Sequence, residues 1–215
     1  MDVVIAGGHG KIGMDLGRLL AERGDRARGL IRKREHEAEL RDAGIEPVLC
    51  DLESGANLAA AIEGADAVVF AAGAGSGSGA DRKWTVDYAG AAKLIVAALA
   101  GDVRRYVMVS AMGAASPPDG DDVFSIYLRA KAQADRELQA SDLDETIVRP
   151  GRLTDDPGTG SVTAAPSVDR GEVSRADVAA VLLAVLDEPG TAGATFELVG
   201  GATPIAAAVA ALATR

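Results

Sequence analysis

The chain opens with the stretch MDVVIAGGHGKIG, residues 1–13, in which an apolar segment leads directly into a glycine-rich turn. Gly8, Gly10 and Gly13 satisfy the pattern G-x-G-x-x-G, while Gly7, Gly10 and Gly13 satisfy G-x-x-G-x-x-G. Either pattern alone is weak evidence of a binding site. The context strengthens it, because the residues that follow carry leucines at helical spacing. The stretch therefore predicts a strand, a tight turn and a helix.

A turn of this kind is suited to the pyrophosphate of a dinucleotide. Unpaired backbone N–H groups at a helix N-terminus bind anions, and glycine lets the phosphate approach the backbone closely. An ordinary strand-to-helix loop is the alternative. For His9 we expect loop packing or a phosphate contact rather than catalysis. The residues expected to contact the cofactor here are Gly7, His9, Gly10, Lys11, Ile12 and Gly13.

Composition narrows the class of protein. The 215 residues are enough for one substantial core, and we expect a single domain over residues 1–215. The net charge of −10 argues against nucleic acid and anionic membranes as partners, since both attract clustered Lys and Arg. The one cysteine cannot form an internal disulfide, and no apolar run approaches the length of a membrane span. Because the first expected strand begins at residue 2, we expect no signal peptide and a cytoplasmic location.

Strand-like and helix-like segments alternate along the chain. Such alternation predicts crossover connections and an α/β fold, namely a doubly wound parallel sheet of the Rossmann type. The expected strands cover residues 2–6, 27–32, 46–50, 67–72, 106–109, 145–148 and 195–199, and the expected helices cover residues 14–23, 35–43, 56–63, 82–100, 124–140, 178–186 and 204–213.

Two segments, near residues 112–123 and 153–172, interrupt this alternation. Both follow expected strands and contain clusters of Pro, Gly and Asp. Ligands of open parallel sheets lie beyond the carboxyl ends of the strands, so these segments are where a substrate lid would form. Solvated surface loops are the alternative for each.

The end of the second expected strand bears on the choice of nucleotide. A carboxylate about 20 residues past the glycine turn binds a ribose 2′-hydroxyl, whereas a cation accommodates a 2′-phosphate. The strand has no Asp or Glu before Arg32, and Lys33 follows. These two cations favour NADP(H), with NAD less favoured. Asp51 and Leu52, after the third strand, are expected near the adenine, although Asp51 could equally be a turn residue.

A tyrosine and a lysine four residues apart are candidates for proton transfer. Tyr127 and Lys131 share one face of an expected helix. A phenol is a poor acid or base at neutral pH, and an adjacent ammonium lowers its pKa by favouring the phenolate. Ser110 follows an upstream strand, where its hydroxyl could hold a carbonyl oxygen while Tyr127 exchanges its proton.

Together these residues resemble the short-chain dehydrogenase/reductase superfamily, and more narrowly its atypical NAD(P)H-binding, NmrA-like and flavin-reductase-like branch. The resemblance covers essentially the whole chain and includes Arg149-Pro150-Gly151 after the sixth strand. It implies that Lys131 holds the nicotinamide ribose. It further implies cofactor contacts beside the adenine ribose from Ala71, Ala72 and Gly73, and beside the nicotinamide from Pro150, Gly151, Arg152 and Leu153.

The chain departs from that family at one catalytic position. Many members carry an Asn that completes a proton relay, and the corresponding residue here is Asp87. An ionised carboxylate accepts hydrogen bonds but cannot donate them. Asp87 therefore takes part in a modified relay, or turnover is weak or absent.

The sequence thus favours an NADP(H)-dependent oxidoreductase or epimerase-like enzyme that acts on a small carbonyl or alcohol. Ser110, Tyr127, Lys131 and Asp87 are the expected catalytic residues. The alternatives are a binding protein that senses NADP(H) without turnover and a flavin-reductase-like enzyme in which Tyr127 matters little. No Cys/His cluster has metal-ligand spacing, so no metal is expected. The expected partner is a small-molecule substrate, and the sequence does not indicate an oligomeric state.

Overall fold

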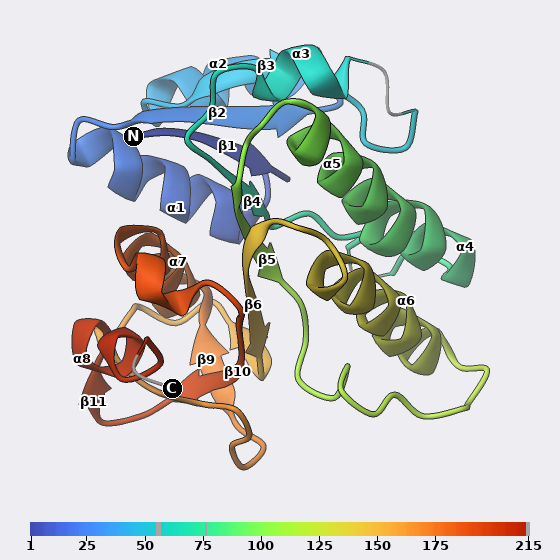
Figure 1. Ribbon diagram of the computed structural model, residues 1–215, viewed down its shortest axis with the longest axis vertical. Helices are drawn as coiled ribbons and strands as arrows, with labels where there is room; N and C mark the ends of the chain where they lie inside the picture. Colours follow the sequence, from blue (N-terminus) through green and yellow to red (C-terminus); the bar gives the residue numbers. More distant parts are fainter. Residues whose placement is uncertain (55–56, 76, 214–215) are drawn as a thin grey trace.

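A large, mostly parallel sheet forms the centre of the protein in a computed structural model that describes residues 1–54, 57–75 and 77–213 (Figure 1). The strands are β1 (Asp2–Ala6), β2 (Arg26–Ile31), β3 (Glu46–Leu49), β4 (Ala67–Phe70), β5 (Arg105–Val109), β6 (Asp144–Pro150), β7 (Arg152–Thr154), β8 (Ser161–Ala165), β9 (Glu172–Ser174), β10 (Ala194–Gly200) and β11 (Thr203–Pro204). The helices are α1 (Lys11–Glu22), the 3₁₀ turn η1 (Arg34–His36), α2 (Glu37–Asp42), α3 (Leu58–Ile62), α4 (Ala80–Arg82), the π-helix η2 (Lys83–Tyr88), α5 (Ala89–Ala100), α6 (Val123–Gln139), α7 (Arg175–Asp187), the 3₁₀ turn η3 (Pro189–Thr191) and α8 (Ile205–Ala210).

The strand order confirms the predicted fold class. Within the described residues, nine strands form one sheet in the order β11-β8-β10-β6-β5-β4-β1-β2-β3. Strands β1 to β6 and β10 are parallel, and only the pairs that involve β8 are antiparallel. The chain crosses from β3 to β4 on the other side of β1, so the order reverses between β1 and β4. This is the doubly wound arrangement, in which ligands bind at the point of reversal.

Helices cover both faces of the sheet (Figure 1). Helices α1, α7 and α8 pack on one face, and α3, α5 and α6 pack on the other. After Asp2, strand β1 is apolar and buried on both faces: Val3 and Ile5 belong to the first core, while Val4 and Ala6 belong to the second. A central parallel strand is buried on both sides, so its buried positions are all apolar.

Two sequence expectations change in detail. The helix expected over residues 82–100 is a run of α4, η2 and α5 with a π-helix inside it. The segment 153–172 is not all loop, because it includes the last two residues of β7, all of β8 and the first residue of β9. Strand β8 pairs with β10 in the main sheet. Ala56, at the expected start of the third helix, lies outside the described residues.

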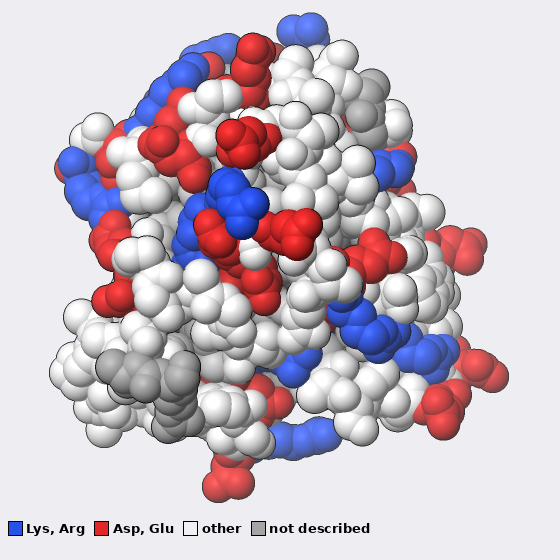
Figure 2. Space-filling model, in the orientation of Figure 1, with Lys and Arg blue, Asp and Glu red and all other residues white. Residues whose placement is uncertain are grey.

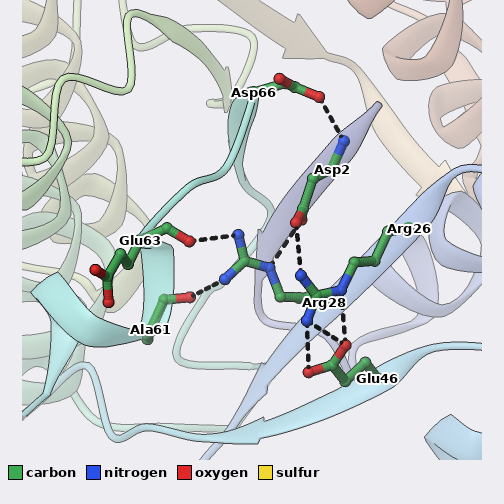
Figure 3. A network of polar contacts seen from close by, with 7 residues as sticks. All are labelled: Asp2, Arg26, Arg28, Glu46, Ala61, Glu63 and Asp66. Carbon is green, nitrogen blue, oxygen red and sulfur yellow. Dashed lines mark hydrogen bonds and ion pairs between the residues drawn. The ribbon is translucent and has the colours of Figure 1, made fainter.

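A buried arginine joins the amino-terminal edge of the sheet to α3 (Figure 3). Arg28, on β2, is 5% exposed. Its Nε donates to Oδ1 of Asp2 at 2.8 Å, and its two terminal nitrogens donate to the carbonyl oxygens of Ala61 and Glu63, each at 3.1 Å. The guanidinium therefore satisfies the end of α3 and fixes it against β1 and β2, at the end of the strands opposite the glycine turn.

On the face drawn in Figure 2, basic side chains lie next to acidic ones rather than in a separate basic area. None of the helices in the described part of the chain is long and apolar enough to cross a membrane.

Candidate active site and cofactor cleft

The glycine turn packs against the turn after β4, at the point where the strand order reverses. Gly7 has a φ of 85°, and a Cβ atom there would lie 2.7 Å from Cα of Ala72. A Cβ atom on Gly13 would lie 2.4 Å from the carbonyl oxygen of Gly7. Both distances are too short for any side chain, so these positions require glycine. The glycines bring the start of α1 close to β1 and β4.

The N-terminus of α1 is suited to an anion. Gly10 is its N-cap residue, and within the described structure neither a capping side chain nor an acidic residue of the first turn occupies this end. The backbone N–H groups of the first turn and the positive end of the helix dipole are thus available to a phosphate. The turn has the backbone geometry that a dinucleotide pyrophosphate needs.

A cleft of about 300 Å³ begins at this turn and extends over the carboxyl ends of β2, β3 and β4. Nine predicted cofactor residues line it: Gly7, His9, Gly10, Arg32, Asp51, Leu52, Ala71, Ala72 and Gly73. The sequence did not indicate seven others: Leu30, Ile31, His36, Cys50, Glu53, Arg82 and Val86.

Three predicted cofactor residues direct their side chains elsewhere. Nζ of Lys11 lies 2.6 Å from Oδ2 of Asp155 and lines a neighbouring hollow. Ile12 is buried in the core beside α7. Nζ of Lys33 lies 3.0 Å from Oε1 of Glu35. For Lys11 and Ile12, only the backbone remains available to a phosphate in this arrangement.

Two arginines meet at one carboxylate on the rim of the cleft. Oε2 of Glu53 lies 2.8 Å from Nη2 of Arg82 and 3.8 Å from Nη1 of Arg32. Thr85 holds the other oxygen of Glu53 through a hydrogen bond of 2.7 Å. Arg82 is far from Arg32 in the sequence, so only the fold brings this second cation to the expected 2′-phosphate position.

The predicted nicotinamide segment, residues 150–153, lies outside the lining of this cleft. Gly151 packs tightly, because a Cβ atom there would lie 2.3 Å from the carbonyl oxygen of Gly171. Arg152 extends to the surface, where its Nε donates to Glu172 at 2.8 Å, and Leu153 packs against the core. The expected contact of this segment with the nicotinamide stays a prediction.

Three of the predicted catalytic residues come together between α6 and η2. Nζ of Lys131 lies 3.4 Å from Oδ1 of Asp87 and 6.0 Å from the centre of the Tyr127 ring, and it donates to the carbonyl oxygen of Val109 at 3.0 Å. Lys131 and Asp87 are almost fully buried, whereas Tyr127 is partly exposed. Among the described residues, the hydroxyl of Tyr127 has no hydrogen-bond partner, so it is available to a substrate.

The pKa of Tyr127 is governed by burial as well as by Lys131. Burial raises the pKa of Tyr127, and Asp87 and Asp135 raise it further, while Lys131 lowers it. The net pKa of the phenol is raised, so the lowering by Lys131 that the sequence predicts is present but is outweighed by burial. Burial lowers the pKa of Lys131, but Tyr127, Asp87 and Asp135 outweigh it and the net pKa is raised. At neutral pH the site therefore holds a protonated phenol beside an ammonium.

The hydroxyl of Ser110 points to a carboxylate that the sequence analysis missed. Ser110 Oγ donates to Oδ2 of Asp135 at 2.9 Å, and Nε of Arg149 donates to the same oxygen at 2.9 Å. Asp135 lies four residues after Lys131 and eight after Tyr127 on α6. Residues at this spacing share a helix face, so the pattern that selected Tyr127 and Lys131 could also have selected Asp135.

A second lysine flanks Tyr127. Lys83, at the start of η2, is buried, and its Nζ lies 5.4 Å from the centre of the Tyr127 ring. The same ammonium donates to the carbonyl oxygen of Gly75 at 2.9 Å. Single π-helical turns within longer helices are frequent at functional sites. No group of three or more potential metal ligands occurs among the described residues.

Comparison with known proteins agrees with the geometry of the cleft. A family described as NAD(P)H-binding matches residues 7–189. The chain belongs to this family. It is 44% identical over 211 residues to the Bacillus subtilis protein YhfK, named as an uncharacterized sugar epimerase, with 97% of this chain and 99% of that protein covered.

Solved structures show the same relationship. One solved structure is that of a Bacillus halodurans protein, which is named only provisionally as an NAD-dependent epimerase/dehydratase. Its TM-score is 0.93 at 39% identity, and the match covers 99% of this chain and 100% of that one. The oxidoreductase ylbE from Lactococcus lactis has a TM-score of 0.87 at 26% identity, with 100% and 98% covered. The resemblance to the atypical short-chain dehydrogenase/reductases is confirmed, and the protein is a member of an NAD(P)-binding, oxidoreductase- or epimerase-like family.

Proposed function

We propose that the protein is an NADP(H)-dependent oxidoreductase that reduces a small carbonyl compound or oxidises the matching alcohol. The observation that carries this proposal is the Tyr127 hydroxyl, which has no partner in the part of the chain that the structure describes. Tyr127 is half-buried next to the ion pair of Lys131 and Asp87. A protein that only binds nucleotide has no need of a free phenol beside a buried ammonium.

The cleft supports NADP(H) as the cofactor. Gly7 and Gly13 allow the close backbone packing that brings the uncapped N-terminus of α1 to the cleft, where its N–H groups can bind a pyrophosphate. Arg32 and Arg82 converge on Glu53 at the end of β2 and β3, where a 2′-phosphate would lie. Arginine binds phosphate in a bidentate manner, and two arginines favour the phosphorylated nucleotide.

Tyr127 and its neighbours can transfer one proton to or from the substrate. The nicotinamide, when bound, supplies or accepts a hydride. Because the pKa of Tyr127 is raised, the phenol is protonated at neutral pH and donates its proton to the substrate oxygen during reduction. The ammonium of Lys131 then stabilises the phenolate that is left. In this state the site favours reduction, and oxidation requires a pH high enough to ionise the phenol.

The loss of NADPH absorbance in the presence of aldehydes, quinones and flavins tests this function. We expect consumption of NADPH with at least one carbonyl compound. Tight NADPH binding without consumption by any acceptor would instead favour the sensing protein. Consumption with free flavin alone, unchanged in Tyr127→Phe, would favour the flavin-reductase-like enzyme.

A further inference from the structure

One carboxylate oxygen of Asp135 accepts hydrogen bonds from both the hydroxyl of Ser110 and the guanidinium of Arg149. Oδ2 of Asp135 accepts from Ser110 Oγ at 2.9 Å and from Arg149 Nε at 2.9 Å, and Nη2 of Arg149 lies at the same distance. Asp135 is 1% exposed. Among the described residues, its other oxygen, Oδ1, is buried and has no hydrogen-bond partner. One oxygen is therefore saturated and the other is free.

This arrangement restricts what Ser110 can do. A serine hydroxyl has one hydrogen to donate. In the structure that hydrogen is directed to Asp135, which leaves only lone pairs for another group. While this bond is made, Ser110 cannot donate to a substrate carbonyl oxygen. The hydrogen bond to Asp135 therefore blocks the role expected for Ser110 from the sequence.

We propose that Asp135 is a positioning residue whose protonation releases the Ser110 hydroxyl to the substrate oxygen. The proton is taken up at Oδ1, the oxygen without a partner. The bond from Ser110 to Oδ2 then changes from a charge-assisted one to a neutral one of about half the strength. Ser110 can rotate and donate to the carbonyl oxygen that Tyr127 protonates. This proposal rests on the reduction proposed above.

The surroundings of Asp135 favour its protonated form. Burial raises the pKa of Asp135, while Ser110, Arg149 and Lys131 lower it, and the net pKa is raised. On α6 the charged or titratable neighbours are Tyr127 and Lys131. Arg149 faces Asp135 from β6, and Asp87 belongs to the same cluster from η2.

The pH profile of kcat/KM for reduction of an aldehyde that the protein accepts is the first test. The wild type loses activity as the pH rises through the pKa of Asp135. In Asp135→Asn the amide oxygen takes the place of Oδ2 and holds Arg149 and Ser110 through hydrogen bonds to a neutral group, as protonated Asp135 does. The amide does not titrate, so this loss disappears. Above the transition the Asn variant exceeds the wild type by about tenfold, as expected for one hydrogen bond gained in the transition state.

Two further variants serve as controls. Asp135→Glu keeps a titratable carboxyl and retains a pH-dependent loss, while Asp144→Asn, an exposed aspartate on β6, retains the wild-type profile. An Asn variant that is folded and keeps the wild-type pH dependence would overturn the proposal.

A second experiment needs no turnover. The infrared carbonyl band of protonated Asp135, identified by its absence in Asp135→Asn, is followed against pH in the ligand-free protein. Since the hydrogen bond from Ser110 lowers the pKa of Asp135, Ser110→Ala moves this titration to higher pH. A titration that Ser110→Ala leaves in place, or an Asp135 that stays ionised wherever the protein is folded, would refute the coupling. If the coupling holds but no carbonyl is reduced, the proposed function fails and the catalytic use of Asp135 fails with it.

Discussion

The ammonium of Lys131 lies 3.4 Å from Oδ1 of Asp87, and both side chains are withdrawn from solvent. Asp87 also accepts from the backbone N–H of Ala74 at 3.1 Å through its other oxygen. The carboxylate of Asp87 thus ties η2 to α6 and to the turn after β4. Its charge also reaches Tyr127 and raises the pKa of the phenol.

Asp87→Asn tests that charge. Reduction needs a protonated phenol, so activity is present below the pKa of Tyr127 and is lost above it. Removal of the Asp87 charge lowers this pKa, and we expect the alkaline loss of kcat/KM to move to lower pH. The exposed Asp81→Asn, on α4, is the matched control. An alkaline limb that stays in place would show that Asp87 does not act on Tyr127.

Arg32 is expected to select the phosphorylated nucleotide. Arg32→Ala should weaken NADPH binding by about tenfold or more and leave NADH binding nearly unchanged, because only NADPH carries the 2′-phosphate. Calorimetric titration with both nucleotides measures the ratio. Lys33→Ala is the control, since Lys33 pairs with Glu35 outside the cleft. Equal losses for NADPH and NADH would place Arg32 away from the 2′-phosphate.

The glycine turn makes a steric prediction. In Gly13→Ala the new methyl group would lie 2.4 Å from the carbonyl oxygen of Gly7, so α1 must move away from the turn. We expect the loss of nucleotide binding, measured by NADPH fluorescence, together with a lower thermal midpoint. Gly79→Ala places its methyl group in open space and should change neither. Normal NADPH affinity in Gly13→Ala would contradict the cradle.

Stability depends on Arg28 at the far end of the sheet. Arg28→Met keeps much of the side-chain volume but leaves two helix-end carbonyls unpaired and removes one of the two arginines that hold Asp2. Breaking a buried ion pair of this kind costs about 3 kcal/mol, and we expect that loss in urea unfolding. Arg26→Met, on the exposed side of the same network, should have little effect (Figure 3). Similar losses for both variants would show that burial is not the cause.

The parts of the fold that the sequence predicts are those with a local signal. The alternation of β1 to β6 with helices is visible because the central strands β1, β4 and β5 are buried and largely apolar. Strands β7, β9 and β11 have two or three residues, too few to show a period. Strand β8 gives no strand signal in the sequence, because Val162 is its one fully buried apolar residue and its neighbours are small or polar.

The same distinction applies to the site. Tyr127 and Lys131 were found because helical spacing places them on one face, and Asp135 was within reach of that argument. The hydrogen bond between Arg82 and Glu53, 29 residues apart, depends on how the fold places α4 beside the turn after β3. Likewise, the direction of the Tyr127 pKa shift depends on burial, which outweighs the lysine charge and which spacing alone does not reveal.

Tyr127→Phe tests the central claim most directly. With a carbonyl substrate found in the NADPH assay, kcat should fall by about 100-fold or more, the usual contribution of a general acid, while NADPH affinity remains unchanged. Tyr88→Phe, which removes the hydroxyl that donates to Glu137 at the contact of η2 with α6, should retain activity. A Tyr127→Phe protein that binds NADPH and reduces the substrate as fast as the wild type would contradict the account.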